Sequence, residues 1–454
     1  MIQLLKMPSQ KAEAESLFSG IWVRWRTLNL AERFVCGIIV LLPLWWVLGI
    51  IPYLLYLIAT SVAAYEWRQY KKLRLQRPSL VVIALFAYFA YECLGSVLLY
   101  FDAHPLASLP PDAARKPLDL VEAVLSVFAF PYLVWYIQSN NVRVRLEVVA
   151  WACSVSIIQS LGLWLVVHFV YSEAFYTPQR TLWAVLTGKS QTYYRGIGNT
   201  NYLVMYWPDD KAIAGFSRFY SFFHGPESFG LFVGVVGTLA LDLKNRLWSV
   251  LLVSASAFLV GLSGTRAVWI AFPTVVFIRL WFTTGKFGGS WLPFALTATM
   301  SFVTLSLTPV TEAILSTSSK TIKFISDFRA NSTEQRSGIY EGSIRGVLDN
   351  PVNFLFGYQV IGEGGVGSHS FLLGSLLYQG GLISTGCFMT FWAALMMWIY
   401  RTRAGRPACS FTILLLLTLT FATMLFAHIA PMAILLSMML GRPTSYQRKN
   451  AAYA

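Results

Sequence analysis

Charged side chains are scarce in this 454-residue sequence, where Asp, Glu, Lys and Arg together make up only 12%. Soluble domains usually carry roughly 25% charged residues. This shortage excludes an ordinary water-soluble protein, because too little charge is present to cover its surface. With 56% of the residues hydrophobic, the sequence predicts one helical body solvated mostly by lipid, rather than several soluble domains.

Cysteine and histidine are also rare, at five residues each. The cysteines all lie in or beside apolar runs, at Cys36, Cys93, Cys153, Cys387 and Cys409. This distribution contains neither a disulfide framework nor the ligand spacing of a structural metal site. The sequence therefore predicts no metal and no cofactor.

The first 33 residues lack the continuous apolar core of a cleavable signal peptide. Apolar residues recur there at helical spacing among arginines, at Phe18, Ile21, Trp22, Trp25 and Leu28. This pattern is typical of an interfacial helix on the cytoplasmic leaflet. The alternative is a basic segment that merely flanks the first span. In either case residues 1–33 are predicted to be a cytoplasmic interfacial segment.

Apolar runs long enough for a bilayer, which needs about 20 residues per crossing, recur through the rest of the chain. They lie near 79–101, 120–138, 146–170, 219–241, 291–309, 371–399 and 410–428. Two more stretches are interrupted, 34–65 around Gly49 and Pro52 and 247–282 at Ser263–Arg266, and a short last helix is expected over 429–440, near Pro431. The pattern predicts an all-α polytopic membrane protein of about 12 spans. A transmembrane domain is expected over 34–441, with 442–454 as a cytoplasmic tail.

Most of the 35 Lys and Arg residues fall on one side of these spans, in short loops and at the two termini. That side is expected to be cytoplasmic. Two long segments, about 172–217 and 310–370, lie on the opposite side and are also basic, which the charge rule allows for long loops. Because such long connections are usually functional, we expect the working surface to be extracytoplasmic. The charge of +14 then fits an anionic membrane surface or an anionic substrate, and no nucleic acid is expected.

The first candidate constellation is Arg218-Phe-Tyr-Ser-Phe-Phe-His224-Gly-Pro226-Glu227, where an aromatic loop runs into the outer end of a span. It gathers Arg218, His224 and Glu227 near the membrane surface. A purely structural cap is the alternative, since Pro226 suits a first helical turn and Glu227 suits its positive end.

The second candidate is Arg266, in the turn Ser263-Gly-Thr-Arg266 between two apolar runs. An arginine at this depth is costly unless it pairs with a carboxylate, a carbonyl or a ligand anion. Its planar guanidinium suits phosphate oxygens. Snorkelling to the interface, with Gly264 as a simple turn, is the alternative.

The third candidate region is the second long segment, which contains Arg336, Arg345, Pro351, a glycine-rich stretch at 362–367 and His369. The glycines permit tight turns but match neither the lysine-containing phosphate loop nor the dinucleotide fingerprint. His369 stands at the outer end of the next apolar run, where an ordinary interfacial histidine is the alternative.

These motifs, in this order and over roughly residues 190–400, resemble the bacterial O-antigen ligase and O-antigen (Wzy-type) polysaccharide polymerase superfamily. The matched residues are Arg218, Pro226, Arg266, Arg336, Pro351 and His369, followed by Gly380-Gly381. The sequence departs from the family at Pro226-Glu227 and His369-Ser370, where Pro-Asn and His-Asn are common. These departures leave the subfamily open.

The resemblance implies a GT-C-like, metal-independent glycosyltransferase of the bacterial inner membrane, with its active site facing the periplasm. Its donor would be an undecaprenyl-diphosphate-linked glycan, its acceptor a glycan or lipid A core, and a chain-length regulator its protein partner. In this scheme Arg218 and Arg266 stabilise the departing diphosphate. His369 takes the proton of the acceptor hydroxyl or orients the acceptor.

The substrate-binding candidates are Arg336, Arg345, His224, Glu227, Arg195 and Tyr194. In the first long segment several aromatic residues suit sugar stacking, namely Tyr193, Tyr194, Tyr202, Tyr206 and Trp207. The alternative is a loop resting on the interface, where Tyr and Trp accumulate anyway.

Three functions remain open on the sequence. The favoured one is polymerisation of surface-polysaccharide repeat units (O-antigen, capsule or exopolysaccharide), with transfer to lipid A core as its variant. A lipid-linked oligosaccharide flippase is the second, which would require midplane ionisable residues and paired broken helices. A structural subunit without catalysis is the third, and it would leave Arg218, Arg266 and His369 without a role.

Overall fold

The structure is a computed structural model that describes residues 17–100, 117–170, 179–188, 201–212, 216–284, 330–359, 361–362, 365–368 and 370–439. The predicted span near 291–309 lies outside these described residues, as do the 442–454 tail and the N-terminal part of the 1–33 segment.

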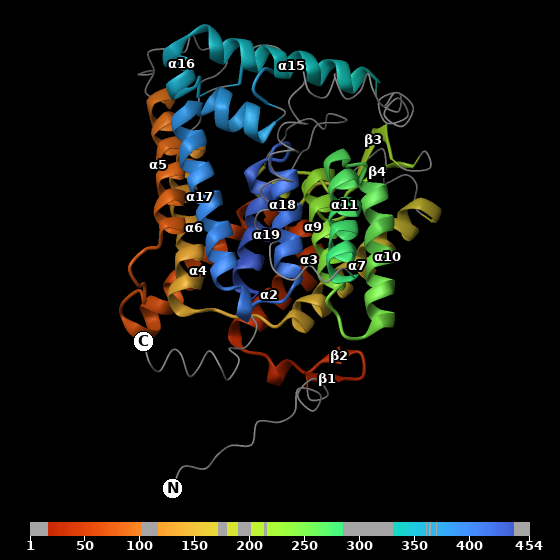
Figure 1. Ribbon diagram of the computed structural model, residues 1–454. Coiled ribbons are helices and arrows are strands. Elements are labelled where there is room, and N and C mark those ends of the chain that lie inside the picture. The colour runs from red at the N-terminus through yellow and green to blue at the C-terminus, as the bar shows by residue number, and fades with distance from the viewer. Residues whose placement is uncertain are drawn as a thin grey trace.

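Helices dominate the described chain (Figure 1). The α-helices are α2 (Leu30–Val40), α3 (Leu42–Leu48), α4 (Leu54–Tyr70), α5 (Leu80–Tyr100), α6 (Pro117–Asn140), α7 (Leu146–Phe169), α8 (Leu182–Leu186), α9 (Pro226–Ala240), α10 (Arg246–Ser263), α11 (Arg266–Thr284), α15 (Ala330–Asp349), α16 (Pro351–Phe356), α17 (Gly381–Arg401), α18 (Cys409–Thr420) and α19 (Phe426–Met438). Short 3-10 turns are η1 (Trp25–Thr27), η2 (Ile51–Tyr53) and η7 (Arg403–Gly405), and η6 (Phe371–Gln379) is a π-helix. Two antiparallel hairpins pair β1 (Phe18–Ser19) with β2 (Trp22–Val23) and β3 (Tyr206–Lys211) with β4 (Ser217–Phe219). The all-α prediction is confirmed.

The helices form two packed groups with α18 and α19 between them (Figure 1). In one group α5 packs against α6 and α17, and α6 packs against α4. In the other, α9 packs against α10 and α11, and α7 packs against α2 and α9. Helix α19 contacts both α6 and α9, and thereby joins the groups. One continuous apolar core runs through this arrangement.

Four described helices are long and apolar enough to cross a membrane, or five spans result if the bent pair α2–α3 counts as one. They are Leu80–Leu98, Leu146–Phe169, Arg246–Ser263 and Gly381–Arg401. Large apolar side chains also stand exposed on their outer faces, such as Leu247 and Ile158. Such surfaces suit lipid rather than water, so this chain is a membrane protein.

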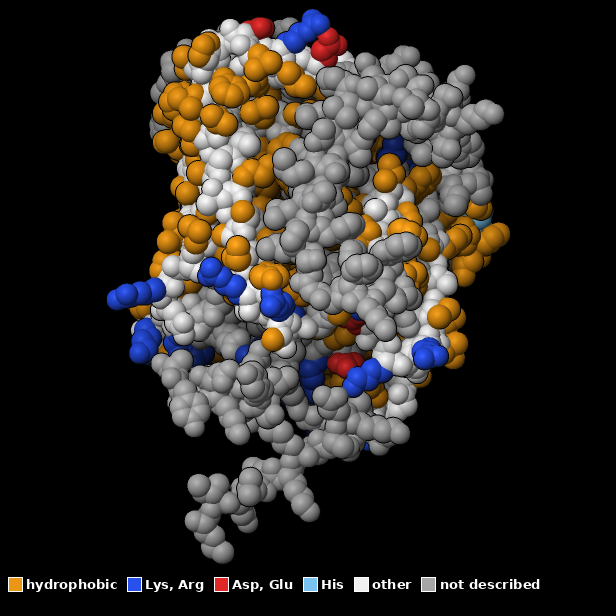
Figure 2. Space-filling model, in the orientation of Figure 1, with side chains coloured by type: hydrophobic (Ala, Val, Ile, Leu, Met, Phe, Trp, Pro, Cys, Tyr) orange, Lys and Arg blue, Asp and Glu red, His pale blue; other side chains and the backbone are white. Residues whose placement is uncertain are grey.

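Basic residues gather at the end of the bundle that carries β1 and β2, as the blue side chains in Figure 2 show. The connections 71–77, 141–145, 242–246 and 402–406 all lie at this end. Two of their arginines pair with buried carboxylates, Arg74 with Glu66 at 2.8 Å and Arg145 with Glu32 at 2.6 Å. Helices α15 and α16 lie across the opposite end (Figure 1).

A buried ion pair between Asp242 and Arg279 ties α9, α11 and α18 together at the basic end. Asp242 also accepts a hydrogen bond from the backbone amide of Cys409. Because removal of one partner leaves the other charge buried without it, we expect Asp242→Ala to lower the free energy of unfolding by about 3–5 kcal/mol. Heat or denaturant unfolding of the purified protein measures this.

The matched control for Asp242→Ala is Glu341→Ala, which breaks the exposed pair between Glu341 and Arg345 on α15. Exposed pairs contribute about 0–1 kcal/mol. If both variants lowered the free energy of unfolding equally, Asp242 would not be a residue that holds α9, α11 and α18 together.

The structure corrects the predicted N-terminal helix. Residues 18–23 form a hairpin whose turn contains Gly20 at a φ of +63°, so the helical spacing of the apolar residues there was misleading. The turn geometry that glycine allows outweighs a weak periodicity. Helix α2 then begins at Leu30, where Asn29 caps it and Glu32 completes a capping box.

Three apolar runs are broken at points that hydropathy does not mark. The 34–65 stretch ends a helix at Gly49 as predicted, but it also bends by 60° between α2 and α3. The 371–399 run divides at Gly380-Gly381, where η6 meets α17. The 410–428 run stops at Thr420, and the last helix starts at Phe426 rather than near Pro431, which lies inside it.

The break between α18 and α19 has a visible cause. The carbonyl of Ala422 accepts hydrogen bonds from the Ser370 hydroxyl at 2.7 Å and from the Leu372 amide at 3.1 Å. Irregular backbone at membrane depth is tolerated only where neighbouring protein satisfies it. This packing of η6 against the break fixes where α19 begins.

Candidate functional site

Arg218 is the centre of a buried polar cluster at the end of the bundle opposite the basic loops. It lies on β4, paired with Trp207 of β3, and only 4% of it is exposed. Its Nε donates to the carbonyl of Ser263 at 2.9 Å, and its Nη2 pairs with Glu227 at 3.2 Å. These two bonds fix the plane of the guanidinium.

Glu227 reaches this cluster because the chain turns directly from β4 into α9. Pro226 occupies the first turn of α9, where its missing N–H costs no hydrogen bond, and Glu227 follows it. The helix thus begins at Pro226, as that residue's preference suggested, and not near 219, where the apolar run begins. A carboxylate is also favourable at this positive helix end, so capping and pairing with Arg218 act together.

The turn between α10 and α11 packs directly on Arg218. Gly264 has a φ of +63°, and a Cβ built there would lie 2.9 Å from the Arg218 side chain. Thr265 donates its hydroxyl to the carbonyl of Pro226 at 2.7 Å. Gly230 leaves room for this turn, since a Cβ at that position would lie 2.9 Å from the Ser263 hydroxyl. The predicted break at 263–266 is thus confirmed, and small residues bring it against α9.

Arg266 is the first residue of α11, two residues beyond Gly264, and is half-buried. It therefore adds a second guanidinium to the segment that holds Arg218. The N-terminal end of a helix also presents backbone N–H groups and a partial positive charge. This turn therefore combines two arginines with a helix N-terminus, and Glu227 pairs with one of them.

His428 of α19 completes the cluster, and the sequence interpretation missed it. Its Nδ1 lies 2.5 Å from the hydroxyl of Ser228, which follows Glu227 in α9. It also interacts electrostatically with Glu227 and His224. The available signal was an ionisable residue inside an apolar run, which is by default a functional candidate.

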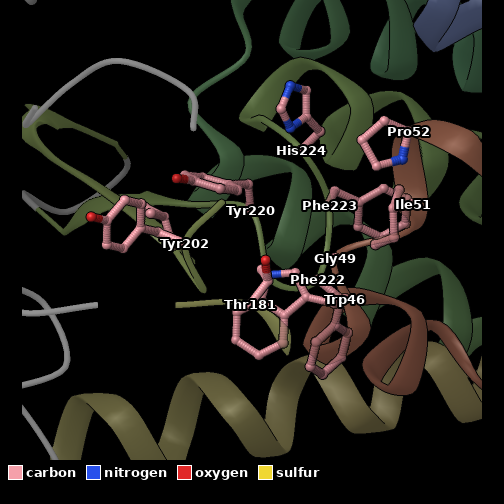
Figure 3. A pocket seen from close by; sticks show the side chains of 11 residues that line it. Trp46, Gly49, Ile51, Pro52, Thr181, Tyr202, Tyr220, Phe222, Phe223 and His224 are labelled. Atoms are coloured by element: carbon pink, nitrogen blue, oxygen red, sulfur yellow. The ribbon is translucent and has the colours of Figure 1, made fainter. Parts of the chain in front are cut away.

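His224 lies at the edge of this cluster and lines a pocket next to it (Figure 3). Its side chain reaches solvent, and the protein atoms around the ring displace water and lower the pKa of His224. The pocket is small, with a volume of about 30 Å³. Arg218 and Glu227 are thus in contact as predicted, and His224 interacts electrostatically with His428 of the same cluster.

The remaining site candidates are not brought to this cluster by the described contacts. Arg345 is exposed on α15 and pairs with Glu341 one turn away. Arg336 lies on the same helix, but its side chain is outside the described residues, as are Tyr194, Arg195 and His369. Their predicted roles stay predictions.

No family model matches this chain, and no curated protein matches it significantly. Among the described residues, no group of three or more His, Cys, Asp or Glu side chains could hold a metal ion. The arrangement that remains is two arginines, a carboxylate and two histidines at one end of an apolar helical bundle. Such a site can bind an anionic group and accept a proton.

Proposed function

We propose that this membrane protein is a glycosyltransferase of the bacterial inner membrane that polymerises polyprenyl-diphosphate-linked glycan at the periplasmic face. The observation that carries the proposal is the oriented Arg218 guanidinium, buried beside the Arg266 turn at the end away from the basic loops. By the positive-inside rule that end is extracytoplasmic. A site there has access to lipid-carried sugars.

The most difficult part of this reaction is the departure of the diphosphate leaving group. An acceptor hydroxyl forms a bond to the anomeric carbon while the bond from that carbon to the diphosphate oxygen breaks. Negative charge then grows on the diphosphate, and positive groups already fixed in place stabilise it. The bonds to Ser263 and Glu227 hold Arg218 so that little reorganisation is needed. Arg266, at the start of α11, would share this role.

The proton released by the acceptor needs a base near the working pH, and an imidazole is suited to it. The sequence proposed His369 for this role. The geometry adds His428, which Ser228 orients and Glu227 influences electrostatically. Glu227 would thus hold the Arg218 guanidinium in position and also influence the charge state of His428.

The variant reaction is transfer of finished glycan to lipid A core, as a ligase. The same cluster would serve it, because donor and leaving group are shared and only the acceptor differs. The aromatic pattern from Arg218 to Glu227 and the basic outer segments favour the polymerase, with the same expected partners as above, including a chain-length regulator.

The test is a gel of surface polysaccharide from the host strain lacking this gene, complemented with wild type, Arg266→Ala or His369→Ala. We expect the deletion to leave core capped by single repeat units and both variants to fail to restore the ladder. Removal of one stabilising donor typically lowers such rates about 10²–10³-fold.

The matched control is Arg246→Ala, since Arg246 also begins a helix, α10, but stands exposed at the basic end. It should restore the ladder fully. Bare core with full-length glycan on the lipid carrier would identify the ligase instead. Full rescue by Arg266→Ala at equal expression would reject this site.

A further inference from the structure

Helix α16 is attached to α5 and α17, two helices that are long and apolar enough to cross a membrane, near their ends away from the basic loops (Figure 1). The Tyr91 hydroxyl on α5 donates to the carbonyl of Phe356, the last residue of α16, at 2.6 Å. Gly381, the first residue of α17, packs on the same turn, since a Cβ built there would lie 2.6 Å from the Leu355 carbonyl oxygen. Helix α16 is therefore fixed to both spans.

The contacts of segment 351–359 with α5 lie at membrane depth. Tyr91 and Gly95, which both contact this segment, are about 17 and 23 Å along the helix axis from Leu80, at a rise of about 1.5 Å per residue. A hydrocarbon core measures about 30 Å. Gly381 likewise begins α17 about 30 Å from the basic end of that helix. The segment therefore lies near the boundary between acyl chains and headgroups, and not above it.

Apolar side chains of this segment continue the lipid-facing surface of the two spans. Val352, Leu355 and Phe356 are exposed. Leu94 of α5 and Leu382 of α17, each adjoining a contact residue in the sequence, are exposed as well. Figure 2 shows hydrophobic side chains gathered over this corner of the molecule. The same solvent, lipid, therefore suits the segment and the spans that hold it.

The backbone at the end of α16 is bonded within the protein. The Phe356 carbonyl also accepts from the side-chain amide of Gln359 at 3.0 Å, and the backbone amide of Gln359 donates to the carbonyl of Gln379 at 2.8 Å. Gly357 turns the chain with a φ of +73°, at a place where a Cβ would overlap the Gln379 carbonyl. Non-helical backbone at membrane depth is tolerated only where protein satisfies it. These bonds satisfy polar groups that such a turn would otherwise present to lipid.

We propose that segment 351–359 lies in the leaflet opposite the basic loops as an interfacial element, with acyl chains of membrane lipids against its apolar side chains. Interfacial helices typically bury their apolar face about 5–10 Å into the boundary between headgroups and acyl chains. The segment 310–370 was expected to lie wholly outside the membrane. Helix α15, with Glu341 and Arg345 exposed, fits that expectation, whereas α16 returns to the lipid. This placement holds whether or not the protein is a glycosyltransferase.

The experiment places trifluoromethylphenylalanine at single positions of the full-length protein in phospholipid nanodiscs. Fluorine NMR then measures how strongly dissolved oxygen, which concentrates among acyl chains, and a water-soluble nickel chelate each speed relaxation of the probe. At Phe356 and Leu355 we expect a ratio of oxygen effect to nickel effect several-fold higher than at Glu341 and close to that at Leu94. The probe at Phe356 keeps the aromatic ring, so this variant should fold like wild type.

Glu341 is the matched control because it is also exposed, on the neighbouring helix α15. A ratio at Phe356 equal to that at Glu341 would place the segment in water and overturn the proposal. Weak effects of both reagents at Phe356 and Leu355 would mean that protein, such as a second copy of this chain, covers the surface, which also overturns it. Neither result affects the transferase proposal, because the polysaccharide ladder tests that separately.

Discussion

Arg218→Ala is expected to leave no detectable polymer ladder. The substitution removes the donor aimed at the departing diphosphate, which typically lowers a rate by about 10²–10³-fold for a single donor. It also removes the charge-assisted bond to Glu227 and the bond to the Ser263 carbonyl. Single-turnover transfer from a lipid-linked donor in proteoliposomes measures this effect.

A loss of folding must be separated from a loss of chemistry at Arg218. Each bond to a charged group contributes about 1.5–3 kcal/mol, so Arg218→Ala lowers stability too. Arg218→Lys keeps the positive charge but cannot bond Ser263 and Glu227 with one planar group. We expect it to fold nearly like wild type and still to lose most of its activity.

The control for the Arg218 pair is Glu227→Gln, which keeps the side-chain shape and removes its charge. A double-mutant cycle of Arg218→Lys and Glu227→Gln should show strong non-additivity in transfer rate, because the two side chains are in contact at 3.2 Å. Additive effects, or a fully active Arg218→Lys, would contradict the role given to the fixed guanidinium.

His428→Asn is expected to lower the transfer rate about 10²–10⁴-fold, the usual contribution of a positioned general base. Asparagine places a polar atom near the position of Nδ1, so the contact with Ser228 can persist. What the variant lacks is a group that titrates near neutral pH. A pH–rate profile of the residual activity, compared with wild type, measures this.

Ser228→Ala separates positioning from proton transfer. It removes the hydroxyl 2.5 Å from Nδ1 but leaves the imidazole, so we expect a smaller loss and an unchanged shape of the pH–rate profile. If His428→Asn retains wild-type activity and pH dependence, His428 is only a packing residue. The base would then have to be sought elsewhere, with His369 as the next candidate.

Backbone turns, and side chains that lie close together in the sequence, were easier to predict than helix boundaries. Pro226 and Gly264 each have a strong backbone preference, and the structure uses both as expected, to start α9 and to turn between α10 and α11. Arg218, His224 and Glu227 could be grouped because they are close in the sequence. Their proximity needed no knowledge of the tertiary fold.

Contacts between distant segments could not be predicted in this way. His428 joins the cluster only because α19 packs on α9, 200 residues away from Ser228. The break before α19 depends on hydrogen bonds from Ser370 and Leu372, which leave no mark in local hydropathy. Similarly, the hairpin at residues 18–23 replaced a helix because one glycine turn outweighed a short apolar periodicity.

The ion pair between Arg218 and Glu227 closes a short loop of chain. Two residues of this loop, Phe219 and Tyr220, belong to the continuous apolar core and are only 0% and 3% exposed. A substitution in that part of the core would therefore also displace the guanidinium, so stability and transfer are expected to change together at this loop.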